Sequence, residues 1–171
     1  MIKQILTIWT RIETILIGLA ILAALAVFLG GALVRLISPS HAVDWAEEVS
    51  LYFIIWATVL SGSSLVAEGR HIHTEVFLSA LSPRARRVLG WAMTALAAGF
   101  VAAMMVFGWQ AFEFALMLDE RSASSLRTQQ GYAVFLALPV GMALILCRIG
   151  LMLADGERPF SGETTMPKRG E

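Results

Sequence analysis

The chain has 171 residues, of which 57% are hydrophobic and only 15% are charged, a balance that excludes an ordinary soluble domain. The formal net charge is zero and the sequence has no basic tract, so nucleic acid is not an expected partner. The single cysteine, Cys147, excludes an internal disulfide and a metal cluster built from cysteines.

The first long uncharged run covers residues 14–34 and is bounded by Glu13 and Arg35. Basic residues precede it, as in a signal peptide, but the run is too long and lacks a convincing cleavage site. We therefore predict a retained first membrane span over about residues 13–37, followed by a helix break at Ser38-Pro39-Ser40.

A second uncharged run, residues 49–67, has the length of a bilayer's hydrocarbon core. Asp44 is placed to cap its helix, and Glu47 and Glu48 put negative charge at the positive end of the helix dipole. Four small residues inside the run allow another helix backbone to approach closely. We predict a second span over about residues 45–68.

Residues 71–81 alternate apolar and polar side chains with helical spacing, over too short a length to cross a bilayer. This pattern predicts a short amphipathic helix lying in the membrane interface. A Ser-Pro pair then restarts a helix, and the third span is expected over about 85–117. In that span Ala95, Gly99 and Ala103 recur every four residues, which predicts a face for close helix packing.

The fourth span is expected over about residues 128–153, with Pro139 bending its helix. Residues 1–155 are thus predicted to form one all-α membrane domain of four transmembrane helices, followed by a polar tail over 156–171. Ten of the 13 Lys and Arg residues fall on the side of the two termini and the connection between spans two and three. This asymmetry predicts a multi-pass protein with both termini in the cytoplasm.

Charged residues near the spans are expected at the membrane edges. Glu13, Arg35, Glu113 and Arg148 all lie near predicted span ends, where a side chain can extend to water. Glu113 lies a turn or two inside the outer edge and could pair with a basic residue of a neighbouring helix. The predicted spans have no charge near their centres, whereas a transporter that works alone usually needs one.

Other chemistry is not expected. His71, His73 and Glu75 are types of metal ligand, but positions two apart on a helix point to different faces. The serines of span two have no histidine in the same span to activate them. We therefore predict no catalytic, cofactor-binding or metal-binding residue, and no enzymatic activity.

Several short motifs, in this order, resemble the DctQ family, the small membrane subunits of tripartite ATP-independent periplasmic (TRAP) transporters. The first motif is Glu47-Glu48-Val49-Ser50-Leu51-Tyr52, followed by Trp56 and Gly62. The second is Glu68-Gly69-Arg70-His71-Ile72-His73-Thr74-Glu75, and the last span adds Ser125-Leu126, Tyr132 and Pro139-Val140-Gly141. Leu51 departs from the arginine that the family often has before the aromatic residue.

The resemblance implies an accessory subunit in the bacterial inner membrane. In such systems a periplasmic binding protein captures an organic acid, and a large membrane subunit holds the substrate and sodium sites. The small subunit braces the large one and has no site or cofactor of its own. The residues expected at partner interfaces lie in the motifs, the small-residue face and the bend: Asp44, Glu47, Glu48, Ser50, Trp56, Gly62, Glu68, Gly69, His71, Glu75, Ala95, Gly99, Ala103, Glu113 and Pro139.

The alternative is an autonomous small transporter or channel made by oligomerisation. In that reading Glu13 or Glu113 supplies a carboxylate that couples ion movement to transport.

Overall fold

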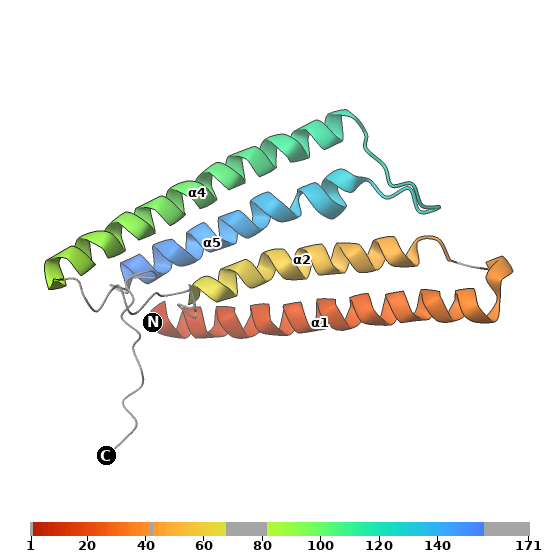
Figure 1. The fold of residues 1–171 in the computed structure, drawn as a ribbon, viewed down its shortest axis with the longest axis horizontal. Helices are drawn as coiled ribbons and strands as arrows, with labels where there is room; N and C mark the ends of the chain where they lie inside the picture. Colours follow the sequence, from red (N-terminus) through yellow and green to blue (C-terminus); the bar gives the residue numbers. More distant parts are fainter. Residues whose placement is uncertain (1, 42, 68–81, 156–171) are drawn as a thin grey trace, which may run out of the picture.

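The computed structural model describes residues 2–41, 43–67 and 82–155, and these residues form an all-helical structure (Figure 1). Its long helices are α1 (Ile2–Ile37), α2 (Ala46–Ala67), α4 (Pro83–Met117) and α5 (Ala137–Ala154). A short 3-10 helix, η1 (Pro39–His41), follows α1, and a π-helix, η2 (Gly131–Phe135), precedes α5. Within the described ranges, four helical segments are long and apolar enough to cross a membrane, as predicted.

The helices form two antiparallel pairs. Figure 1 shows α1 beside α2 and α4 beside α5, and the contacts between α2 and α5 join the two pairs. The start of α1 and the end of α5 lie at the same end of the bundle, which is the arrangement expected of four spans (Figure 1).

Glycines set the closest approaches between helices. A Cβ added to Gly31 on α1 would overlap Ala46 at the start of α2, and one added to Gly141 on α5 would overlap Val59 of α2. Small residues bring helix backbones together in membrane proteins because lipid gives no hydrophobic drive for association. These two contacts fix the register of α2 against both of its neighbours.

Helix ends follow the turn signals of the sequence. Helix α1 ends at Ile37, directly before the predicted break, and Ser82 caps α4 by accepting a hydrogen bond from the backbone N–H of Ala85 at 3.3 Å. Helix α1 begins at Ile2 and so extends beyond the start of the predicted first span. Polar side chains limit a membrane span but do not end a helix, and no glycine or proline interrupts residues 2–13.

The predicted bend at Pro139 takes a different form. Pro139 lies in the first turn of α5, where a missing backbone N–H costs little. The irregularity comes just before it, in η2, where the N–H of Leu136 donates to the carbonyl of Gly131, five residues back, at 2.9 Å. The indole of Trp56 donates to the carbonyl of Ala133 at 2.9 Å and so ties α2 to this π-helix.

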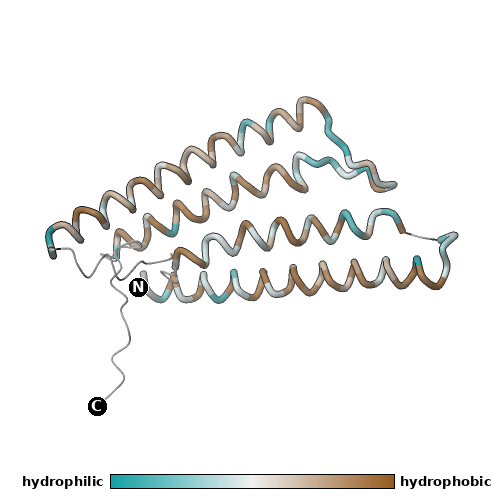
Figure 2. The backbone as a smooth tube through the Cα atoms, in the orientation of Figure 1, coloured by the Kyte–Doolittle hydropathy of each residue, from teal (hydrophilic) through white to brown (hydrophobic). Residues whose placement is uncertain are grey.

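Apolar side chains cover the outside of the bundle as well as its core. Figure 2 shows hydrophobic residues along the middle of each helix and hydrophilic ones in the connection between α4 and α5. Leu22 of α1 is 63% exposed and Leu96 of α4 is 70% exposed. Such a surface is stable in lipid or against another apolar protein, and would aggregate in water.

The predicted interfacial helix over residues 71–81 and the polar tail over 156–171 lie outside the described residues.

Candidate functional site

An ion pair buried between the first and last helices is the main polar feature of the described bundle. Nη2 of Arg148 on α5 lies 2.6 Å from Oε2 of Glu13 on α1. Arg148 is 0% exposed and Glu13 is 4% exposed. Charges this deep are stable only when each has a partner with good hydrogen-bond geometry.

Two further residues of α1 complete this cluster. Trp9 donates its indole N–H to Oε1 of Glu13 at 2.6 Å, so both carboxylate oxygens have donors. Arg148 donates through Nη1 to the hydroxyl of Thr10 at 3.3 Å, and its Cζ lies 5.5 Å from the centre of the Trp9 ring. Trp9 and Glu13 are four residues apart and therefore share one helix face. The cluster holds α5 against α1, although the Nε of Arg148 is buried without a hydrogen-bond partner among the described residues.

The cluster corrects one prediction. Glu13 and Arg148 were expected to reach water at the membrane edge, but the structure buries both and pairs them with each other. Antiparallel packing of α1 and α5 brings the two positions to the same depth, and pairing there costs less than exposing each charge to lipid. Their opposite charges, at the same predicted edge of the first and last spans, were the signal in the sequence.

A second group of polar contacts lies at the opposite end of the bundle. Arg35, at the end of α1, forms an exposed ion pair with Glu47 of α2 at 2.9 Å, as expected for an edge residue. Asp44 accepts hydrogen bonds from the backbone N–H of Ser125 at 2.9 Å and from its hydroxyl at 2.6 Å. The side-chain and backbone bonds from Ser125 lower the pKa of the Asp44 carboxyl.

These contacts link the two connections at that end of the bundle. Asp44 precedes α2, and Ser125 lies between α4 and α5, so the Asp44–Ser125 bonds join the two helical pairs. Glu48 accepts from the hydroxyl of Tyr52 one turn later on α2. The acidic motif therefore has structural partners within this chain, while Glu47 and Asp44 remain exposed.

The outward side of α4 carries the predicted small-residue face. Ala95, Gly99 and Ala103 are exposed, and a Cβ added to Gly99 would meet no atom within 4 Å. The predicted packing face is therefore open within the described part of this chain.

Farther along α4, a groove of about 530 Å³ lies against α5. Its lining includes Trp109, Glu113 and the buried Pro139. Glu113 is exposed and accepts a hydrogen bond from the Trp109 indole at 2.8 Å. The groove thus offers one carboxylate on an otherwise mostly apolar surface.

Of the remaining predicted interface residues, two lie in contacts within this chain and four lie outside the described residues. Ser50 is buried and donates to backbone carbonyls of α2, and Gly62 faces Ile145 of α5. A partner could contact Ser50 only after the helices separated. Glu68, Gly69, His71 and Glu75 lie outside the described residues.

One family model matches the chain over residues 23–158. Its description is "Tripartite ATP-independent periplasmic transporters, DctQ component". The chain belongs to the DctQ family. This result confirms the resemblance based on the motifs of spans two and four. No curated protein matches the chain.

Membership of the DctQ family makes the chain a component of a tripartite periplasmic transporter. The DctQ family is a family of transporter components and not of enzymes. Together with the four apolar helices, it identifies a multi-pass membrane protein. The matched region includes Arg148, the outer contacts and the open face of α4, whereas Glu13 precedes it.

Proposed function

We propose that this DctQ subunit is a scaffold for the large membrane subunit of a sodium-coupled, binding-protein-dependent transporter of organic acids. It has no substrate or ion site of its own. The subunit lies in the bacterial inner membrane with both termini in the cytoplasm, in accord with the distribution of its Lys and Arg residues.

The observation that supports this role most directly is the closed state of the Glu13 carboxylate. A carboxylate that couples transport must release its partner to bind a cation or proton. Both oxygens of Glu13 are already bound, one by Trp9 and one by Arg148, and the pair is sealed from solvent. Releasing Glu13 would leave Arg148 charged and unpaired in an apolar environment, at high cost.

The open side of α4 is the proposed docking face for the large subunit. Ala95, Gly99 and Ala103 let a partner helix approach closely, and the groove beside them adds apolar area. Glu113 gives this face a negative charge, which favours a partner helix with a basic residue at the matching depth. The exposed Asp44 and Glu47 form a separate surface for the periplasmic binding protein.

The alternative function, an autonomous transporter, rests on Glu113. Its carboxylate is exposed in the groove between α4 and α5 and has one hydrogen bond, from Trp109, among the described contacts. In this alternative, the purified chain alone would move substrate or protons in liposomes, and Glu113→Gln would abolish that flux.

The experiment that tests the scaffold compares two glycine variants that leave the fold of this chain intact. Neither Gly99 on α4 nor Gly30 on α1 has an atom within 4 Å of an added Cβ. Gly99→Leu should sharply reduce recovery of the large subunit and uptake in reconstituted liposomes, whereas the matched Gly30→Leu should preserve both. Equal recovery with both variants would exclude α4 as the docking face.

A further inference from the structure

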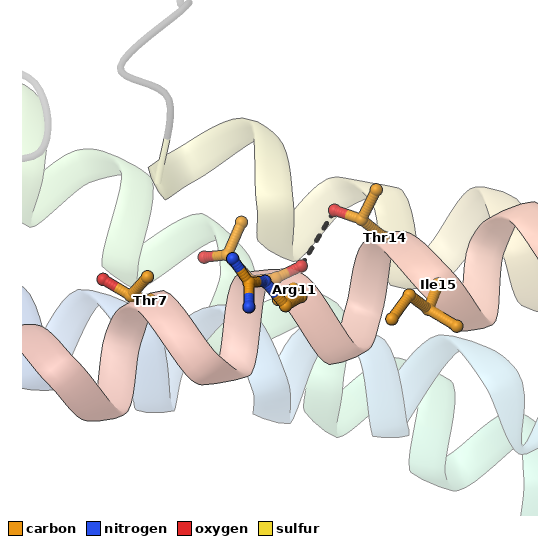
Figure 3. A pocket seen from close by; sticks show the side chains of 5 residues that line it. Thr7, Arg11, Thr14 and Ile15 are labelled. Atoms are coloured by element: carbon orange, nitrogen blue, oxygen red, sulfur yellow. Dashed lines mark hydrogen bonds between the residues drawn. The ribbon is translucent and has the colours of Figure 1, made fainter.

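An open, mostly apolar pocket of about 450 Å³ lies on the outside of α1. Its lining residues, all from this helix, are Thr7, Thr10, Arg11, Thr14 and Ile15. Figure 3 shows the Arg11 guanidinium between the side chains of Thr7 and Thr14. Positions 7, 11 and 14 share one face because residues three and four apart are neighbours on a helix. The pocket thus concentrates one cation and several hydroxyls on a surface that is otherwise strongly apolar.

The register of α1 and α2 places Arg11 at the edge of the membrane. Gly31 faces Ala46, and the two helices are antiparallel. Arg11 lies twenty positions before Gly31 and Val66 lies twenty positions after Ala46, so Arg11 is level with the last turn of α2. Helix α2 has 22 residues and is about 33 Å long, close to the hydrocarbon thickness of a bilayer. The guanidinium therefore lies near the depth of the lipid phosphates.

The charge of Arg11 is not neutralised by the described part of this chain. Glu13, the nearest acidic residue on α1, has its carboxylate bound by Arg148 and Trp9 inside the bundle. No acidic side chain of the described residues forms an ion pair with Arg11, which is exposed. A guanidinium in this position favours an external anion.

Two of the three hydroxyls in the pocket, those of Thr10 and Thr14, already donate to backbone carbonyls of α1. Thr14 donates to the carbonyl of Thr10 at 2.8 Å, and Thr10 donates to the carbonyl of Leu6 at 2.9 Å while accepting from Arg148. The guanidinium supplies planar, paired N–H donors, the geometry that suits phosphate oxygens. The threonines provide a polar wall beside it.

The same face of α1 continues toward the membrane centre as a path for an acyl chain. Ile15, Gly18 and Leu22 follow Arg11 at helical spacing, and a Cβ at Gly18 would meet no atom within 4 Å. A phosphate at Arg11 would thus have an exposed apolar surface directly below it.

We propose that this pocket binds the phosphate of an anionic phospholipid in the leaflet on the side of the chain termini. The inference requires only that the chain spans the membrane, and it does not depend on the scaffold role. Anionic lipids attract arginine and lysine side chains that lie at the membrane surface.

The test is native mass spectrometry of the full chain released from nanodiscs of phosphatidylcholine with a minor share of phosphatidylglycerol. The wild type should retain phosphatidylglycerol selectively, and Arg11→Gln should reduce that retention about tenfold, the loss expected for a charge-assisted contact. Arg84→Gln is the matched control, because Arg84 is an exposed arginine at the same end of the bundle, on α4. It should retain the lipid as the wild type does.

Further measurements distinguish the possible causes of a loss of lipid retention. Arg11→Lys keeps the charge without the paired donors and should restore part of the selective retention, which would tie the loss to the contact and exclude misfolding. Equal losses in the Arg11 and Arg84 variants, or equal retention of phosphatidylcholine by the wild type, would overturn the proposal. Displacement of the lipid by inorganic phosphate would also overturn it, because the pocket would then bind a free anion.

Discussion

Glu13 and Arg148, 135 residues apart in the sequence, meet at 2.6 Å and are almost completely buried. This contact joins the first helix to the last and closes the bundle at the end where the chain begins. It gives the bundle a fixed internal geometry, which the proposed scaffold role requires.

Breaking one side of this pair should destabilise the chain. Glu13→Gln leaves the Arg148 guanidinium buried without a counter-charge, and we expect a loss of about 3–5 kcal/mol in unfolding free energy. Arg148→Met alone should have a similar effect. The double variant should recover much of the loss, because two neutral groups remove the unpaired charge. The unfolding free energies of the three variants can be measured in mild detergent. If Glu13→Gln left the unfolding free energy unchanged, the pair would not hold the helices together.

The two tryptophan–glutamate pairs provide a matched comparison of buried and exposed hydrogen bonds. Trp9→Phe removes the indole donor to the buried Glu13 and should cost about 1–3 kcal/mol. Trp109→Phe removes the same bond, over the same four-residue spacing, to the exposed Glu113. It should change the stability of the isolated chain by less than about 0.5 kcal/mol. Equal effects in thermal unfolding would mean that the Trp9 bond is not protected from solvent.

Replacing two glycines of α5 by alanine should change the stability of the bundle in opposite directions. Gly141→Ala forces a methyl group into Val59 of α2 and should destabilise the bundle by about 1–3 kcal/mol. Gly150 has no atom within 4 Å of an added Cβ, so Gly150→Ala should stabilise the helix by up to about 1 kcal/mol. Melting temperatures of the two variants test the register of α2 and α5, which would be incorrect if Gly141→Ala were also stabilising.

The outer contact between Asp44 and Ser125 should depend on pH. Folding lowers the pKa of the Asp44 carboxyl, so this group stabilises the fold above its unfolded pKa of about 4. The contribution is lost as the pH falls through the lower, folded value. Asp44→Asn should therefore flatten the acid side of the stability profile below about pH 4, measured by unfolding at a series of pH values. An unchanged profile would contradict this assignment.

Much of the architecture could be predicted because long apolar runs and turn residues directly encode spans and breaks. The end of α1 before Pro39 and the start of α4 at Pro83 followed from such local signals. The pairing of Glu13 with Arg148 did not, because it depends on which helices become neighbours. The π-helix at Gly131 was missed for the same reason, since Trp56 of another helix binds its backbone.

The candidate docking face, too, could be predicted from the sequence only in part. The spacing of Ala95, Gly99 and Ala103 predicted a packing face, and the structure leaves that face exposed for a partner. The groove at Glu113 could not be predicted, because it is formed by two helices whose relative rotation is set by Gly108 against Leu138 and Pro139.

The most direct test of the scaffold role is affinity purification of the tagged chain from its native membrane in mild detergent, with the recovered proteins identified by mass. The scaffold role predicts one large polytopic membrane protein in equal amount. Recovery of this chain alone, or only with copies of itself, would contradict that role and favour the autonomous transporter that uses Glu113.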